Sequence, residues 1–375
     1  MLGAEKFMNI NLKSNYSLLD TPCLILQESL LLKNLETAKN LSKSNHKRLR
    51  PHIKAHKSIE IAKLQLNYGA VGICCTKLSE AEVMVDGGIR DILITSPVVG
   101  SVKLERLGKL SQKAKISLVT DNEQQVLSLS EVAKKYNTIL SILVEIDVGQ
   151  GRCGVQPGED AYNIAKVINQ AQNLQFLGLQ AYQGKLQGIK RYSDRLAAVN
   201  DAMQKLANSL EYFKKNNLAV EIITGGGTGS FPIDVQLPFL NELQLGSYVT
   251  MDCNYALDEW DTSGKKKLFC QPLSILSTVI SKPMPNKVIV DAGWKAVTND
   301  GGMPITKNID YLFEYGGDEH GIITCKQPII NLEIGDQVEL IPSHCDTTIN
   351  LYNYLYLVNH LGSRQVLIQA RGMVV

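Results

Sequence analysis

The sequence has no run of about 18 consecutive apolar residues, so a transmembrane helix is not expected. An excess of charge of one sign is also lacking, because 39 Lys and Arg against 37 Asp and Glu leave a formal net charge of +2. Aromatic residues make up only 6% of the chain, with two Trp. The basic field of a nucleic-acid-binding protein is therefore absent, and we expect neither a nucleic acid nor a membrane as a partner.

Paired cysteine motifs and a secretion signal are missing as well. The eight cysteines form no C-x-x-C pair, and the first residues, MLGAEK, lack an apolar core followed by a cleavage site. Cys74 and Cys75 stand in an apolar run, where buried free thiols are expected. We therefore expect a cytoplasmic protein. Its 44% hydrophobic and 20% charged residues are ordinary for a globular chain and exclude a disordered or fibrous one.

The sequence does contain a long alternation of short apolar runs and longer amphipathic ones. Eight strands are predicted, at residues 49–54, 70–76, 91–95, 116–119, 140–147, 174–182, 220–224 and 243–249. Helical patterns separate the first seven, and one further helix, at residues 28–44, precedes the first strand. Because parallel neighbours need a crossover that a helix usually supplies, this alternation predicts the α/β class.

Eight strands in about 200 residues favour a closed (β/α)8 barrel, the TIM barrel, over an open doubly wound sheet. The open sheet is the alternative, but its glycine-rich dinucleotide turn is missing, because the first strand ends Lys54-Ala55-His56. After residue 259, strand-like runs dominate, at residues 272–281, 287–291, 337–341, 351–358 and 365–370. We expect a barrel of residues 24–258 and an antiparallel β domain of residues 1–23 and 259–375.

A lysine stands at the end of the first predicted barrel strand, where barrel enzymes keep their working residues. Desolvation at the barrel mouth would lower the pKa of Lys54 and let it form a Schiff base. A solvated basic turn is the alternative. His52 and His56 flank this lysine in a chain with only six histidines, which favours a functional role.

A segment of four glycines and three hydroxyl residues, TGGGTGS at residues 224–230, follows the seventh predicted strand. Backbone N–H groups in such a turn suit phosphate oxygens, and loops after the seventh and eighth strands commonly build a phosphate site. The candidate phosphate ligands are Thr224, Gly226, Gly227, Thr228, Gly246, Ser247 and Tyr248. A lysine opposite a phosphate cradle indicates pyridoxal 5′-phosphate (PLP) as the cofactor.

Three further residues are candidates for contacts to the cofactor. Tyr182 closes the sixth predicted strand and could flank the cofactor ring, although a rim aromatic is the alternative. Arg152 follows the fifth strand among glycines, where a contact to the cofactor's phenolic oxygen or to a substrate carboxylate competes with a plain surface position. His52, one of the two histidines that flank Lys54, is the third candidate.

A candidate metal site lies in the predicted β domain. His344 and Asp346 are two residues apart, and in an extended segment such residues point the same way. An imidazole and a carboxylate with open positions favour Mn²⁺ or Mg²⁺, with Zn²⁺ or Co²⁺ as alternatives. The pair alone is weak support for a metal site.

Together these motifs resemble those of the D-threonine aldolase and D-serine dehydratase group of PLP enzymes, which share the alanine racemase-like fold. The likeness runs from residue 21 to the C-terminal strands and includes RPHIKAHK at residues 50–57, which resembles the cofactor-lysine motif. The resemblance implies that Lys54 is the Schiff-base residue. It also implies a homodimer in which the β domain of one chain covers the barrel mouth of the other.

Within this family the metal motif separates two activities. Dehydratases tend to show His-x-Cys, whereas aldolases tend to show His-Cys-Asp followed by Thr and Asn, as in HCDTTIN at residues 344–350. The resemblance therefore implies a PLP- and metal-dependent aldolase that cleaves a D-3-hydroxy amino acid, such as D-threonine, to glycine and an aldehyde. The alternatives are a D-serine or D-3-hydroxyaspartate dehydratase, an amino-acid racemase and a non-catalytic PLP-binding protein.

The chain departs from the aldolase pattern at two positions. Ala55 replaces the usual Thr after the lysine. Gly188 stands where the aldolases commonly have a His that is proposed to deprotonate the substrate hydroxyl. A hydroxide on the metal, Lys185 or His56 would then accept that proton, and the sequence leaves these three candidates open.

Overall fold

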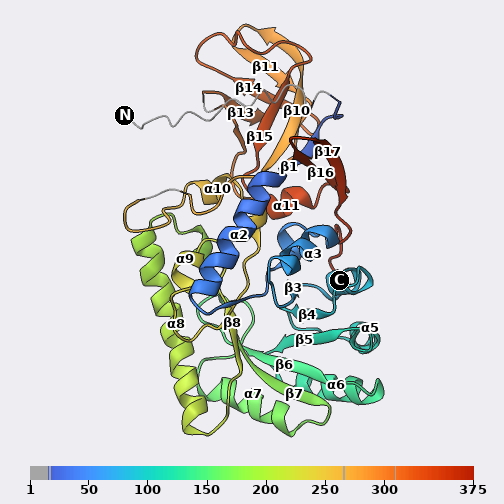
Figure 1. The fold of residues 1–375 in the computed structure, drawn as a ribbon, viewed down its shortest axis with the longest axis vertical. Coiled ribbons are helices and arrows are strands. Elements are labelled where there is room, and N and C mark those ends of the chain that lie inside the picture. The colour runs from blue at the N-terminus through green and yellow to red at the C-terminus, as the bar shows by residue number, and fades with distance from the viewer. Residues whose placement is uncertain (1–15, 17, 265–266, 309) are drawn as a thin grey trace.

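The computed structural model describes residues 16, 18–264, 267–308 and 310–375, and these residues form two parts built on two β-sheets. Figure 1 shows the helix-covered sheet in the lower half of the molecule and the second sheet above it, with the helix α2 (Glu28–Ser44) beside their junction. Residues 1–15 of the predicted β domain lie outside the described residues.

The first sheet has eight parallel strands in the order β2-β9-β8-β7-β6-β5-β4-β3. Their bounds are β2 Arg48–Leu49, β3 Ile73–Cys75, β4 Asp91–Ile94, β5 Lys115–Thr120, β6 Leu140–Glu145, β7 Leu174–Ala181, β8 Ile222–Gly225 and β9 Glu242–Leu243. A parallel bridge between His52 and Cys74 joins the two ends of this order. The predicted barrel of the α/β class is therefore confirmed.

The barrel interior is filled by apolar side chains, as the alternation of inward and outward residues along each strand requires. One residue from each of six strands contributes to a buried cluster: Cys74, Leu93, Val119, Leu143, Leu177 and Ile222. At the seam between β2 and β9, the buried Arg50 guanidinium donates from Nε to Glu242 at 2.9 Å and from Nη1 to Asp91 at 2.6 Å. This charged group links β2 to two other strands.

Helices cover the outside of the barrel (Figure 1). Their bounds are α3 Ile59–Asn67, α4 Leu78–Asp86, α5 Ser101–Ser111, α6 Glu123–Lys135, α7 Glu159–Gln170, α8 Tyr192–Lys215, α9 Phe231–Asp234 and α10 Cys253–Ala256. In α6 the Asn122 side chain caps the first turn, and Val126, Leu129 and Ala133 bury one face of the helix. None of the helices in the described part of the chain is long and apolar enough to cross a membrane.

The second sheet has nine strands, and most of its pairings are antiparallel as predicted. Its strands are β1 Cys23–Gln27, β10 Leu273–Met284, β11 Lys287–Val290, β12 Ile305–Thr306, β13 Leu312–Tyr315, β14 Gly321–Thr324, β15 Gln337–Ile341, β16 Tyr354–Asn359 and β17 Gly362–Leu367. The β1 strand pairs with β16 in parallel, so the sheet is mixed. The boundaries at residues 24 and 258 remain a prediction, and the pairing of β1 favours placing the first of them after Gln27.

Three local expectations from the sequence are wrong. The eighth barrel strand, expected at residues 243–249, covers only Glu242–Leu243, and Ser247–Val249 form a 3₁₀ helix. The first barrel strand ends at Leu49 rather than at Lys54, which lies in the 3₁₀ helix Ile53–Ala55. Residues 345–349 form the helix α11 (Cys345–Ile349) rather than an extended segment, so His344 and Asp346 do not alternate along a strand. This short helix contains β-branched residues, which have weak helix propensity, so its sequence does not indicate a helix.

Candidate active site

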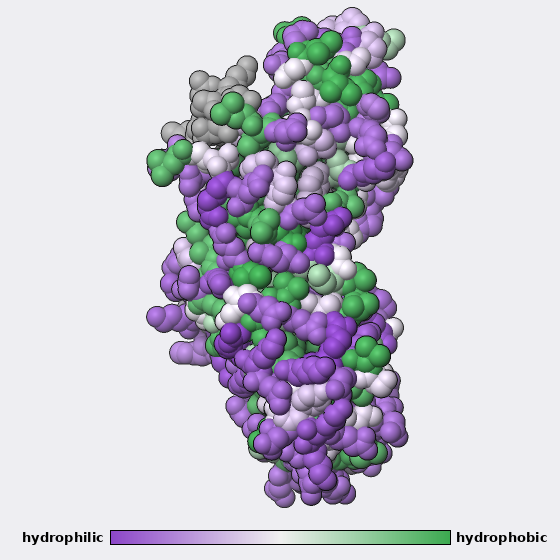
Figure 2. Space-filling view, turned by 90° about the vertical axis from the view of Figure 1, so that its right-hand side faces the viewer, coloured by the Kyte–Doolittle hydropathy of each residue, from purple (hydrophilic) through white to green (hydrophobic). Residues whose placement is uncertain are grey.

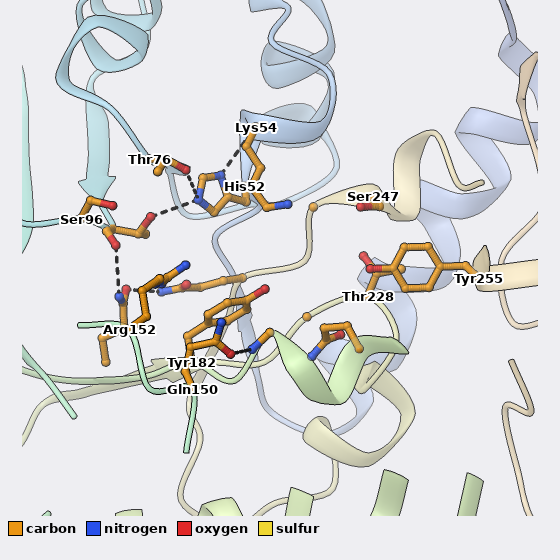
Figure 3. Close-up of a pocket in the computed structure, with 17 residues that line it drawn as sticks. His52, Lys54, Thr76, Ser96, Gln150, Arg152, Tyr182, Thr228, Ser247 and Tyr255 are labelled. Carbon is orange, nitrogen blue, oxygen red and sulfur yellow. Dashed lines mark hydrogen bonds between the residues drawn. The ribbon is translucent and has the colours of Figure 1, made fainter. Parts of the chain in front are cut away.

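A cavity of about 290 Å³ opens at the carboxyl ends of the barrel strands (Figure 3). It is lined by eight of the residues predicted from the sequence: His52, Lys54, Arg152, Tyr182, Gly227, Thr228, Gly246 and Ser247. These residues come from loops that follow β2, β6, β7, β8 and β9. The cavity thus lies at the carboxyl ends of the barrel strands, where the active sites of TIM barrels are expected.

Lys54, at the barrel mouth, contacts a carboxylate in the part of the chain that forms the second sheet. Its Nζ donates to Oδ2 of Asp346 at 2.5 Å, and the Asp346 side chain is only 13% exposed. Burial lowers the pKa of Lys54, but the carboxylate of Asp346 more than offsets this, and the pKa lies above its usual value. The expected lowering of the Lys54 pKa is therefore wrong, because the Asp346 carboxylate lies against the ammonium group.

His52 is buried and held in one orientation at the wall of the cavity. Its Nδ1 accepts the backbone N–H of Lys54 at 3.2 Å, and its Nε2 lies 3.0 Å from Oγ1 of Thr95 and 3.2 Å from Oγ1 of Thr76. Since Nδ1 accepts, the ring proton resides on Nε2. Burial and the charge of Lys54 hold the pKa of His52 well below its ordinary value, so the ring is neutral.

The glycine-rich loop after β8 lines the cavity with part of its backbone, and other backbone N–H groups of the loop donate to nearby side chains. Gly227 donates its N–H to Asp234 at 3.2 Å, and Ser230 donates its N–H to Gln187 at 3.1 Å. Burial raises the pKa of Asp234 to about 7. What faces the cavity is the edge formed by Gly227 and Thr228, with Gly246 and Ser247 beside it.

Arg152 and Tyr182 form a second wall. The Arg152 guanidinium lies 5.6 Å from the centre of the Tyr182 ring, and its Nη2 is 3.7 Å from Oε1 of Glu145. Glu145 ends β6, is 3% exposed, and has no hydrogen-bond partner for Oε2 among the described residues. Burial raises its pKa to about 7, although the charge of Arg152 opposes the shift.

The two predicted metal ligands lie at the start of α11. His344 precedes the helix, and its Nδ1 lies 2.5 Å from Oδ2 of Asp300. Burial raises the pKa of Asp346. The positive charge of Lys54 and, to a smaller extent, the charge of His344 lower it by more, so the pKa lies below its ordinary value. In the described ranges, no group of three or more His, Cys, Asp or Glu side chains is placed to hold a metal ion, so a metal site at His344 and Asp346 remains a prediction.

Some predicted residues are not brought to the cavity wall. His56 is buried, shares a hydrogen bond with Gln65 and has its pKa lowered to about 4 by burial, so it cannot reach a substrate as the proton acceptor. The hydroxyl of Tyr248 accepts from Gln65, and that of Thr224 accepts from Gln244. Lys185 is exposed in the 3₁₀ helix Lys185–Gly188, next to the wall residues Gly184 and Gln187. Gly226 does not line the cavity either.

The structure adds polar wall residues that the sequence did not reveal. They are Thr76, Thr95, Ser96, Gln150, Gln180, Gln187, Gln244 and Tyr255. Thr76, Thr95 and Ser96 directly follow β3 and β4, so the strand-end rule applied to every strand would have found them. Burial holds the pKa of Tyr255 well above its ordinary value, so its hydroxyl stays protonated.

Comparison with known proteins agrees with this arrangement. The family model of the alanine racemase N-terminal domain matches residues 27–253, and a serine dehydratase domain matches residues 272–358. The chain is 38% identical over 342 residues to 3-hydroxy-D-aspartate aldolase of Paracoccus denitrificans (strain Pd 1222), covering 90% of this chain and 88% of the relative. It belongs to the alanine racemase-like family that includes this aldolase.

Other members of the family agree in length and in fold. D-threonine aldolase of Arthrobacter sp is 38% identical over 340 residues, covering 90% of this chain and 89% of the relative. The crystal structure of D-threonine aldolase from Filomicrobium marinum superposes with a TM-score of 0.92 at 36% identity, covering 95% of this chain and 97% of that one. The dehydratases of the family are more distant, as D-serine dehydratase of Dictyostelium discoideum shares 24% identity.

Proposed function

We propose that this chain is a PLP- and divalent-metal-dependent aldolase that cleaves D-3-hydroxy amino acids, of the D-threonine type, to glycine and an aldehyde. The central support is the contact between Lys54 and Asp346. It brings the predicted cofactor lysine, which lines the cavity, into contact with a predicted metal ligand that lies 292 positions away in the chain.

The cavity fits the cofactor at three points. Lys54 supplies the amine, and the ring of His52, fixed by Thr76 and Thr95, offers a flat neutral face beside it. Gly246 lies close to both, since a Cβ there would lie 3.6 Å from His52 and 3.9 Å from Lys54. The edge of Gly227, Thr228, Gly246 and Ser247 would receive the phosphate, with hydroxyls as donors.

When bound, PLP would accept the electron pair of the breaking Cα–Cβ bond of the substrate. Arg152 would meet an anionic oxygen of cofactor or substrate, because its guanidinium lines the cavity. The Tyr182 ring beneath that guanidinium restricts its position. Tyr255 can donate a hydrogen bond at this wall, because its hydroxyl stays protonated.

The pair His344 and Asp346 fits a divalent cation such as Mn²⁺, because Nε2 of His344 has no hydrogen-bond partner among the residues that the structure describes. A cation there would lower the pKa of the substrate's β-hydroxyl. Mg²⁺, Zn²⁺ and Co²⁺ suit the same ligands. Of the two side chains predicted to accept the hydroxyl proton, we keep Lys185, since its turn borders the cavity.

Two finer expectations belong to this proposal. A homodimer is supported by exposed apolar side chains on the second sheet, among them Ile280, Met284 and Leu312, and Figure 2 shows apolar surface gathered at that tip. A cytoplasmic location is supported by the eight cysteines, all of which are free.

A coupled assay for the aldehyde tests the proposal. Purified protein with PLP, Mn²⁺ and D-threonine should release acetaldehyde and glycine in equal amounts, and Lys54→Ala should release neither. The alternatives give other results: a dehydratase forms 2-oxobutanoate and ammonia, and a racemase changes only the configuration at Cα. A racemase or a non-catalytic PLP-binding protein should also be indifferent to EDTA. Release of 2-oxobutanoate without acetaldehyde would replace the aldolase with the dehydratase.

A further inference from the structure

A second acidic residue, Asp300, contacts the candidate metal site from a different loop. Asp300 lies between β11 and β12, outside the motifs that the sequence singles out. Its Oδ2 lies 2.5 Å from Nδ1 of His344, and its Oδ1 accepts from Oγ1 of Thr347 at 2.7 Å. Both carboxylate oxygens are thus engaged by residues at the start of α11, and the group is fixed in its plane.

The surroundings hold this contact in place. Oγ1 of Thr347 also lies 2.8 Å from Oγ1 of Thr298, which joins the loop to α11 a second time. Next to Asp300, Gly301 approaches so closely that a Cβ there would lie 3.2 Å from Cβ of His344. The loop at residues 298–301 and the first turn of α11 therefore behave as one packed unit around the imidazole.

A carboxylate at Nδ1 determines which ring nitrogen can bind a cation. Because the carboxylate accepts, the Nδ1 position carries the proton, and the lone pair of a neutral ring resides on Nε2. That nitrogen has no hydrogen-bond partner within the described part of the chain. Metal-binding histidines usually show this arrangement, in which an outer carboxylate fixes the tautomer and the ring orientation.

We propose that Asp300 is a positioning residue that presents Nε2 of His344 to the divalent cation. This inference rests on the proposed function, because it assumes that His344 is a metal ligand. Asp300 contacts His344 and Thr347 rather than Lys54 or the cavity wall, so its effect on the reaction would act through the start of α11, where His344 lies.

The test measures Mn²⁺ binding to the PLP-loaded protein without substrate, by electron paramagnetic resonance of the free ion. Asp300→Ala should weaken Mn²⁺ binding by about 10- to 100-fold, the usual effect of removing such a partner. Asp300→Asn, which still accepts a hydrogen bond, should weaken it less. The exposed Asp310→Ala is the matched control and should bind as the wild type does. The absorbance of the bound cofactor should be unchanged in all three variants.

A second readout reports the ring itself. With ¹⁵N-labelled histidine, His344 of the metal-free protein should carry its proton on Nδ1, and Asp300→Ala should shift it toward Nε2. Wild-type Mn²⁺ affinity in Asp300→Ala, together with weakened binding in His344→Ala, would overturn this inference and leave the metal site intact. Unchanged binding in His344→Ala as well would overturn the metal site and this inference with it. If Asp300→Ala does not fold, Asp300→Asn decides by the same measurement.

Discussion

Glu145 shows how one buried side chain can make the stability of the whole chain depend on pH. It is 3% exposed and lies behind Arg152 at the end of β6. Its pKa rises from the ordinary 4.5 to about 7, mainly through burial. Between these values the folded protein holds a proton that the unfolded chain has lost. The contribution of Glu145 to the free energy of unfolding is therefore fully present below about pH 4.5 and is lost as the pH rises through 7.

We predict that Glu145→Gln removes this pH dependence. The shift corresponds to about 3 kcal/mol, at roughly 1.4 kcal/mol for each pKa unit. Urea unfolding at pH 5 and pH 8 should show a smaller loss of stability in the variant than in the wild type, by about 2–3 kcal/mol. The exposed Glu131→Gln on α6 is the control. Equal losses in wild type and Glu145→Gln would show that Glu145 titrates as an ordinary glutamate.

Gly188 is the residue at which the chain departs most clearly from the aldolase pattern. It ends the 3₁₀ helix Lys185–Gly188, is exposed, and a Cβ there would meet nothing within 4 Å. A histidine at this position therefore has room beside the cavity residue Gln187.

We predict that Gly188→His raises the rate of D-threonine cleavage. General-base assistance is typically worth roughly 10²–10⁴-fold, which sets the upper limit of the gain. The comparison is kcat against Gly188→Gln, which adds similar bulk without a base. If both variants behave alike and the wild type is already fast, another group accepts the proton, and Lys185→Ala becomes the deciding variant. A gain in Gly188→Gln equal to that in Gly188→His would contradict the base role.

The residues that line the cavity were more predictable from the sequence than their pKa values. Lys54 and the predicted phosphate ligands Gly227 and Thr228 line the cavity, and they were predictable because a lysine and a run of glycines are unusual near strand ends. Thr76 and Thr95 also directly follow strands, β3 and β4, but a single hydroxyl residue at a strand end stands out less than a lysine or a run of glycines. The pKa of Lys54 was predicted in the wrong direction because its partner, Asp346, is 292 positions away in the chain.

At the scale of elements, the seam between β2 and β9 depends on one ion cluster. The β2 strand has two residues and β9 also has two, so few backbone bonds hold them together. Arg50 and Glu242 are 7% and 1% exposed at the side chain, and a Cβ on Gly72 would lie 2.1 Å from Nη1 of Arg50. The guanidinium therefore fills this part of the seam and leaves no room for a larger residue at position 72.

We predict that Arg50→Ala destabilises the protein by about 3–5 kcal/mol, because it leaves the buried Glu242 carboxylate with only the partly exposed Arg48, 3.9 Å away, as a counter-charge. The double variant Arg50→Met with Glu242→Met should cost less, since it removes both charges and keeps most of the volume. Denaturant unfolding of the two variants at one pH gives the comparison. A loss below about 1 kcal/mol in Arg50→Ala would mean that water already compensates Glu242.

Elements with strong local patterns were predictable, and elements held by distant contacts were not. The apolar runs of β4, β6 and β7 are buried on both faces and were found within two residues of their ends. The β13 and β14 strands were missed because each has four residues and only partial burial. The helix α11 was missed because its place against the barrel, through Asp346 and Lys54, stabilises residues with weak helix propensity.

At the scale of the whole molecule, the two parts meet where the chemistry is proposed. The segment at residues 342–346 is joined to the barrel side by four contacts besides Lys54. Cys253 donates its N–H to Pro342, Asn254 donates its side-chain amide to Ser343, Cys345 donates its N–H to Asp252, and Ser247 donates its hydroxyl to Asp346. The second sheet therefore delivers His344 and Asp346 to the barrel mouth within a single chain.

The reaction itself is decided most directly by a carbon-13 NMR spectrum of the products formed from uniformly ¹³C-labelled D-threonine, with PLP and Mn²⁺ present. We predict resonances of glycine and acetaldehyde in equal amounts, which EDTA abolishes and Mn²⁺ restores. Signals of 2-oxobutanoate would identify a dehydratase, and a threonine stereoisomer altered only at Cα would identify a racemase. An unchanged D-threonine spectrum, repeated with D-3-phenylserine and D-3-hydroxyaspartate at saturating Mn²⁺, would contradict the aldolase assignment.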